Sequence, residues 1–118
     1  MKEVNVYITP GLFPLKRFAG ITLWPFGIYF RTITSISLRN INHEKIHWCQ
    51  QKEMLGLFFY LWYFLEWFIK LFQYGRETYR NIGFEREAYK YMYNPYYLEN
   101  RKKYHWLKFV SNDTDKTE

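Results

Sequence analysis

The chain carries two histidines and a glutamate at the spacing of a zinc site, in the run His43-Glu44-Lys45-Ile46-His47. Four residues on a helix make slightly more than one turn, so both imidazoles leave the same face and can direct one nitrogen each at a single tetrahedral ion. Glu44 projects about a quarter-turn away, where its carboxylate can reach a water molecule on the metal. The pattern predicts metal-assisted hydrolysis.

The residues around this motif predict a helix. No proline or glycine interrupts residues 38–55, which is enough for four to five turns. Helical spacing separates two faces. The motif face holds His43, His47, Gln50, Gln51 and Met54, and the opposite face, expected to be mostly solvated, holds Asn42, Lys45, Cys49, Lys52 and Glu53. Since Cys49 points away from the histidines, we expect it to be structural.

A hydrolytic zinc site generally takes three protein ligands and leaves the fourth position to water, so another donor is needed. The candidates are His105, Glu66, Glu77, Glu85, Glu87 and Glu99. Glu66 has Lys70 four residues later as a partner, which gives it a structural explanation. Glu85 and Glu87 belong to a segment that could fold back beside the motif helix, and either could instead form surface salt bridges. Gln50 and Gln51 are expected to support the site through hydrogen bonds or to lie on the helix surface, and not to react themselves.

Length and cysteine content restrict the architecture. A chain of 118 residues can bury one core, so we expect residues 1–110 to form a single domain and the polar residues 111–118 to be disordered. Cys49 is the only cysteine, which excludes an internal disulfide. The first ten residues have no continuous apolar stretch typical of a secretory signal, so we expect a cytoplasmic protein, with peripheral membrane association as a possibility.

Charge and aromatic content bear on partners. The net charge is +6, but the basic residues are scattered and interleaved with acids, so no nucleic acid is expected as a partner. The residues 101–103, Arg-Lys-Lys, are expected to form a solvated helix face. Phe, Trp and Tyr make up 24% of the chain, so part of the surface is expected to be aromatic and could support a homo-oligomer.

Turn residues and hydrophobic periodicity predict an α+β fold. Residues 18–23 and 28–36 are expected to form an antiparallel hairpin, with Pro25 and Gly27 in its turn. The motif helix, an apolar helix, a glutamate-bearing helix over residues 84–93 and a C-terminal helix should follow. Asn94 as cap and Pro95 at the first helical position start the last helix, which runs to Lys108.

The apolar helix, residues 54–72, allows two interpretations. Residues 54–65 are uncharged, but twelve residues are fewer than a membrane span needs, so a buried helix is expected. The alternative is peripheral membrane contact through this segment, because Tyr60, Trp62, Tyr63 and Trp67 have the chemistry of rings at a lipid headgroup boundary.

The motif followed after a helix by Glu85-x-x-Ala88 resembles the gluzincin group of zinc metallopeptidases, especially the branch whose glutamate ligand lies in an E-x-x-A-D helix. It is also similar to small zincin-like proteins with H-E-x-x-H-x-x-Q-Q, matched here through Gln51. The resemblance covers about residues 19–93. Tyr89 departs from the pattern, because an aspartate at that position would orient a ligand histidine.

The resemblance implies a minimal zincin-like fold and one Zn²⁺ per chain. His43, His47 and Glu85 would be the ligands, with Glu87 as an alternative, and Glu44 the general base acting on a peptide or protein substrate. Tyr89 and His105 are the candidate oxyanion stabilisers. In zincins the substrate strand pairs with a sheet edge, for which residues 28–33 are the expected equivalent. The alternative is a non-catalytic zinc-binding or membrane-peripheral module on the same scaffold.

Overall fold

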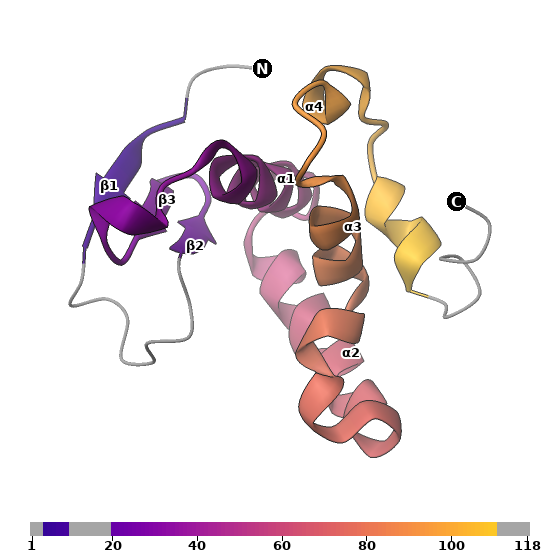
Figure 1. The fold of residues 1–118 in the computed structure, drawn as a ribbon. Helices are drawn as coiled ribbons and strands as arrows, with labels where there is room; N and C mark the ends of the chain where they lie inside the picture. The colour runs from indigo at the N-terminus through magenta and orange to yellow at the C-terminus, as the bar shows by residue number, and fades with distance from the viewer. Residues whose placement is uncertain (1–3, 10–19, 111–118) are drawn as a thin grey trace.

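The computed structural model describes residues 4–9 and 20–110, in which a small sheet is followed by four helices (Figure 1). The predicted α+β class is confirmed. In Figure 1 the sheet lies to the left of α1, α3 lies to its right and α2 lies below. The predicted polar tail, residues 111–118, lies outside the described residues.

The sheet contains the predicted hairpin and one further strand. The prediction of a second strand reaching residue 36 was wrong, because Ile33–Ser35 form a 3-10 turn, and residues 18 and 19 lie outside the described residues. β2 (Gly20–Leu23) and β3 (Gly27–Phe30) pair antiparallel, and β1 (Val6–Ile8) pairs parallel to β3, so the strand order is β1-β3-β2. Because β3 has a partner on both sides, the prediction that it offers an edge to a substrate strand was wrong. A Cβ at Gly27 would lie 2.7 Å from the Tyr7 ring, so the close approach of β1 to β3 at this position requires glycine.

The motif helix α1 (Leu38–Glu53) forms as predicted and ends two residues earlier than expected. The Ser37 hydroxyl accepts a hydrogen bond from Asn40 N at its start. The solvated-face prediction was wrong for Asn42, which is buried. Its amide nitrogen donates to backbone carbonyls at the end of α3, namely those of Tyr91, Met92 and Asn94.

Helix α2 (Leu57–Tyr74) follows a sharp turn in which Leu55 and Gly56 have φ values of 54° and 70°. The prediction that this helix is buried was wrong, since only Phe59, Glu66 and Lys70 are buried and most of its apolar side chains are exposed. Within the described residues, no single helix is long and apolar enough to cross a membrane; α1 and α2 pass such a test only as a pair, bent by 108°.

The predicted pairing of Glu66 with Lys70 is confirmed, at 2.7 Å, and it fixes the start of the next helix. Glu66 Oε2 accepts a hydrogen bond from Gly83 N at 2.7 Å, and Lys70 Nζ donates to the carbonyl of Asn81. Helix α3 (Gly83–Tyr91) has no side-chain cap from its own N-cap residue. Its first turn is therefore held by an ion pair from α2, two residues before Glu85.

The predicted C-terminal helix is broken into α4 (Tyr97–Asn100) and a 3-10 turn (His105–Phe109). Arg101 is extended between them and is not the solvated residue predicted, whereas Lys102 and Lys103 are exposed. The Arg101 guanidinium forms ion pairs with both Glu53 and Glu87, and its side chain is 4% exposed. The residue that forms these two ion pairs therefore lies where the predicted helix is interrupted.

Two buried clusters pack around α3. One joins α2, α3 and the last 3-10 turn through Phe59, Ile82, Phe84 and Trp106. The other joins α1, α3 and α4 through Ile46, Ala88 and Tyr97. Since α3 contributes to both clusters, its position relative to α1 is fixed from two sides.

Candidate metal centre

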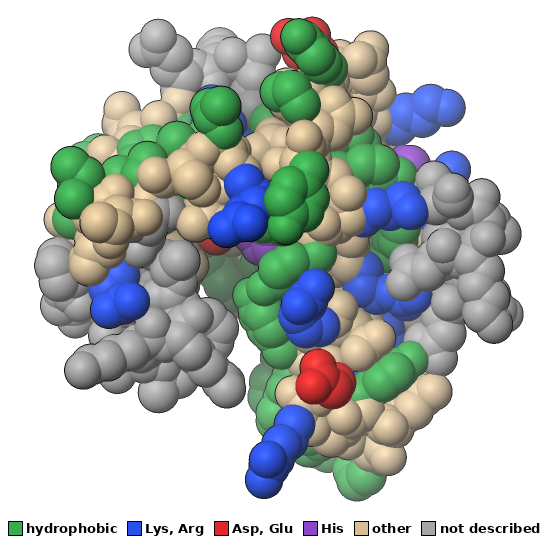
Figure 2. Space-filling model, in the orientation of Figure 1, with side chains coloured by type: hydrophobic (Ala, Val, Ile, Leu, Met, Phe, Trp, Pro, Cys, Tyr) green, Lys and Arg blue, Asp and Glu red, His purple; other side chains and the backbone are tan. Residues whose placement is uncertain are grey.

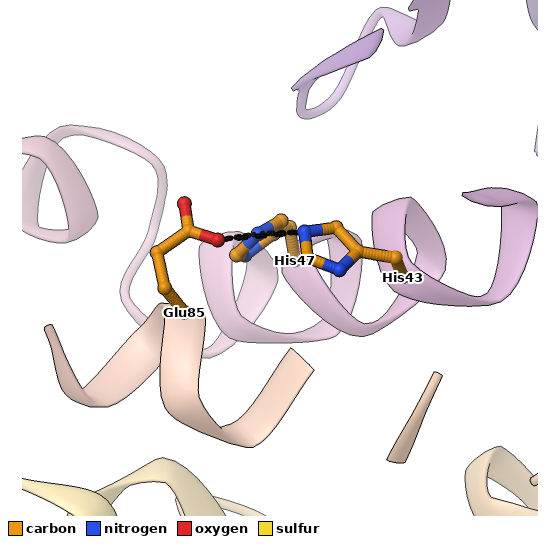
Figure 3. Close-up of side chains that lie close together, drawn as sticks. All are labelled: His43, His47 and Glu85. Carbon is orange, nitrogen blue, oxygen red and sulfur yellow. Dashed lines mark hydrogen bonds and ion pairs between the residues drawn. The ribbon is translucent and has the colours of Figure 1, made fainter. Parts of the chain in front are cut away.

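His43, His47 and Glu85 form a buried group that can hold a metal ion (Figure 3). The two histidines leave the same face of α1, and Glu85 extends from α3 toward them. All three residues are 5–6% exposed. The structure thus brings together the predicted third donor and the two motif histidines.

The donor atoms are spaced as zinc ligands are. The two Nε2 atoms are 3.2 Å apart, and Glu85 Oε1 is 3.0 Å from His47 Nε2 and 3.4 Å from His43 Nε2. Tetrahedral zinc with bonds of about 2.0–2.1 Å separates its ligands by roughly 3.3–3.4 Å. A point about 2 Å from all three atoms lies just outside their plane, so the geometry fits one small cation.

The charges of this group reinforce one another. Burial alone would lower the pKa of His47, but the charge of Glu85 and a hydrogen bond to it outweigh this effect and raise the pKa to about 9. Burial acts to raise the pKa of Glu85, but the positive charge of His47 and hydrogen bonds from both histidines hold it well below its usual range. Without a metal, the group is an ion pair at neutral pH, with His47 protonated and Glu85 ionised.

Gln50 fixes the proton of His47 on the nitrogen that faces away from Glu85. Its amide nitrogen donates to Glu87 Oε1 and to the carbonyl of Phe84, both at 2.9 Å, so its amide oxygen faces His47. His47 Nδ1 lies 2.8 Å from that oxygen, which can only accept. Nδ1 therefore carries hydrogen, and in the neutral ring Nε2 presents its lone pair to a metal.

Glu87, the alternative ligand, is completely buried and fully engaged elsewhere. Its carboxylate accepts hydrogen bonds from Gln50, Tyr97 and Arg101. It supports His47 through Gln50.

His43 lacks a support of this kind. Its Nδ1 is among the buried nitrogen atoms of the described residues without a hydrogen-bond partner. The ring of Tyr89 packs edge-on against the His43 ring, with centroids 4.6 Å apart. Tyr89 is the residue that stands where the E-x-x-A-D pattern has aspartate. Ring packing thus replaces the hydrogen bond that would orient His43.

Glu44 lies beside the group and is held by the sheet. Thr22 Oγ1 donates to Glu44 Oε1 at 2.7 Å and also lies 2.9 Å from the Glu44 carbonyl. Glu44 is 8% exposed, and its negative charge contributes to the raised pKa of His47. The Glu44 carboxylate therefore lies close to the three candidate metal ligands. Its Oε1 is hydrogen-bonded to Thr22 and not to any of these ligands.

Gln51 joins α1 to the outer edge of β2. Its amide nitrogen donates to the carbonyl of Thr22 at 2.7 Å, and its amide oxygen accepts from Trp24 N at 2.7 Å. The Tyr60 hydroxyl also donates to the Thr22 carbonyl, at 3.4 Å. The strand edge beside the motif helix is thus already occupied by side chains.

The two candidate oxyanion stabilisers lie in different places. Tyr89 contacts His43, whereas the ring of His105 packs against Tyr91, Tyr97 and Phe109. Tyr89 is the candidate at the site.

Sequence reasoning missed three supports of the site: Tyr63, Thr22 and Arg101. The Tyr63 hydroxyl donates to Glu85 Oε2 at 2.9 Å, and burial together with the charge of Glu85 raises the pKa of Tyr63 far above its usual value, so the hydroxyl stays a donor. Tyr63 stands among many similar rings. Nothing in its local sequence distinguishes it.

Comparisons of the chain with protein-family models, curated proteins and solved structures return no match.

Proposed function

We propose that this protein is a zinc-dependent hydrolase that cleaves peptide bonds, with His43, His47 and Glu85 as ligands. Two imidazoles and one carboxylate in tetrahedral spacing suit zinc, which accepts nitrogen and oxygen donors and binds three protein ligands in hydrolytic sites. The observation that carries the proposal is the triangle of three donor atoms at 3.0–3.4 Å with Glu44 beside it.

Bound zinc would polarise a carbonyl and a water molecule at the open position. Glu44 would accept the proton of that water as its oxygen adds to the carbonyl carbon, and would return the proton to the amine nitrogen as the C–N bond breaks. Thr22 binds Oε1 of this carboxylate, so Oε2 is the oxygen that performs the transfer. Gln50 keeps the His47 proton on Nδ1, and Tyr63 orients Glu85, so both ligands present lone pairs to the ion.

The test compares Glu44→Gln with Glu99→Gln, a carboxylate on the exposed surface. We expect both variants to bind one zinc per chain by metal analysis. Glu44→Gln should lose roughly a hundredfold or more of its hydrolysis of a quenched peptide library, because the proton acceptor is gone. Glu99→Gln should cleave normally, and Glu85→Ala should lose the metal. Unchanged cleavage by Glu44→Gln would refute the assignment of the base.

A second candidate, a non-catalytic zinc module, draws support from the burial of all three donors and from the unpartnered His43 Nδ1. It predicts stoichiometric zinc without cleavage of any library peptide. Tightly bound zinc in the wild-type protein together with no cleavage of any library peptide would favour this candidate.

A further inference from the structure

Helix α2 presents an apolar stripe to the outside, although its sequence contains two charged residues. The stripe follows helical spacing along the helix, and its members are 49–81% exposed. It consists of Leu57, Leu61, Phe64, Leu65, Phe68 and Phe72. We call these six residues the outer stripe of α2.

The outer stripe has no charge because the charged residues of α2 face inward. Glu66 and Lys70 are buried, paired with each other and bonded to the start of α3. Taking about 200 Å² for a fully exposed side chain of this size, the outer stripe exposes roughly 700 Å². The largest apolar patch on an ordinary monomer is about 300–600 Å², so the stripe is expected to bind something.

The exposed charge of the described residues favours a negatively charged partner. Among the described residues, eight lysine and arginine side chains are exposed but only two carboxylates, Glu77 and Glu99, because the other glutamates are buried or half-buried in the interior contacts. Figure 2 shows this imbalance on one face, where blue side chains are widespread and red ones are few. Exposed Lys52 and Arg76 lie just before and just after α2.

We propose that the outer stripe of α2 docks on an anionic lipid bilayer, with α2 lying in the plane of the interface. Acyl chains would cover the apolar side chains while headgroups neutralise the basic surface. A second copy of the chain would cover the stripe equally well, but it would bring two positively charged surfaces together. Tyr60 and Trp62, 44% and 37% exposed, add partly exposed aromatic surface on α2.

Docking in this way would place the metal centre close to the membrane. Tyr63 and the outer stripe belong to opposite faces of one helix, and a helix with its side chains is about 10–12 Å across. Peptide segments next to the bilayer would then be the ones nearest the metal group. The docking itself does not depend on hydrolysis and would hold for a non-catalytic zinc site.

The experiment is flotation of the full chain with vesicles, using Leu65→Glu and, as a matched control, Leu107→Glu. Both leucines are exposed, at 58% and 52%, and Leu107 belongs to the last 3-10 turn. The vesicles are phosphatidylcholine alone or with about 30% phosphatidylglycerol. Circular dichroism and light scattering establish that each variant is folded and report its oligomeric state.

We expect wild type and Leu107→Glu to float with the anionic vesicles and Leu65→Glu to bind them roughly tenfold or more weakly, since a carboxylate would enter the interface. Binding should weaken with added salt and be much lower on phosphatidylcholine alone. Equal flotation of the two leucine variants would overturn the proposal. The proposal would also be overturned if the wild-type protein formed a dimer that did not bind vesicles and if Leu65→Glu, but not Leu107→Glu, converted that dimer to monomers. A second copy of the chain would then cover the stripe.

Discussion

The Tyr63 hydroxyl donates a hydrogen bond to Glu85 Oε2 over 2.9 Å, which ties the candidate third metal ligand to helix α2. The other carboxylate oxygen, Oε1, faces the two imidazoles. One carboxylate oxygen of Glu85 thus faces the candidate metal position, and the other accepts the hydrogen bond that orients the side chain. Losing this support should cost affinity without removing a ligand.

Tyr63→Phe is expected to weaken zinc binding roughly tenfold while one zinc per chain is still bound at saturation. Competition with a chromophoric chelator measures the affinity. Tyr93→Phe, at an exposed tyrosine, is the matched control and should bind as wild type does. An unchanged affinity in Tyr63→Phe would mean that Glu85 does not serve as a ligand through this arrangement.

Tyr89→Asp is expected to strengthen zinc binding roughly tenfold, because a carboxylate near His43 would give Nδ1 the acceptor it lacks. Tyr89→Ala removes the same ring without adding an acceptor, so it should bind zinc no better than wild type. If both variants bind zinc equally, the unpartnered nitrogen does not limit affinity.

Thr22→Val should slow peptide hydrolysis roughly tenfold and leave zinc affinity unchanged, since valine has the same shape but cannot hold Glu44. Steady-state kinetics should show the loss in kcat. Thr34→Val, on the exposed turn before α1, is the control. A parallel loss of zinc would instead indicate that Thr22 supports the fold of the whole site.

The pH dependence of zinc binding follows from His47. Because burial is outweighed by Glu85 and the pKa of His47 is about 9, the metal must displace a proton at neutral pH. Zinc affinity should therefore rise about tenfold per pH unit from neutrality toward pH 9 and then level off. Calorimetry in buffers of different ionisation enthalpy should detect close to one proton released at pH 7.

The stability of the metal-free protein should show the opposite trend. Because its pKa is raised, His47 contributes stability that is fully present below pH 6.5 and is lost as the pH rises through 9. Because its pKa is lowered, Glu85 contributes stability that is fully present above pH 4.5. The pair thus stabilises most between pH 4.5 and 6.5. Thermal unfolding from pH 6 to 9 should show a fall in Tm that is absent in His47→Gln.

Arg101→Met is expected to lower the free energy of unfolding by about 3 kcal/mol or more, because Glu53 and completely buried Glu87 would lose the cation they share. The neighbouring change Lys102→Met, at an exposed position, should stay within about 0.5 kcal/mol. Urea unfolding of the two variants provides the comparison.

Helical geometry predicted one part of the site, because the spacing of His43 and His47 dictates a shared face. Glu85 was expected only from the resemblance of Glu85-x-x-Ala88 to a zincin motif, with Glu87 as the alternative. Support by Gln50 and Gln51 was expected, although their partners were not. Tyr63, Thr22 and Arg101 were missed because each acts through a contact distant in sequence, and chemically similar residues surround them.

The orientation of α2 was mispredicted for a related reason. An apolar helix with one ion pair is expected to turn the ion pair to water and its other residues to the core. Here Glu66 and Lys70 instead satisfy the backbone at the start of α3, including Gly83 N and the carbonyl of Asn81. The Glu66–Lys70 pair faces inward because α3 begins beside it. The hydrophobic periodicity of α2 gives no information about where α3 begins.

The amide of Gln51 has a consequence for selectivity. The Thr22 carbonyl and Trp24 N are already bonded to that side chain, so an extended polypeptide approaching β2 there cannot pair with these two groups without displacing it. Recognition through main-chain hydrogen bonds alone would not distinguish one peptide sequence from another. A protein that closes this route would have to discriminate between ligands by the shape and polarity of their side groups.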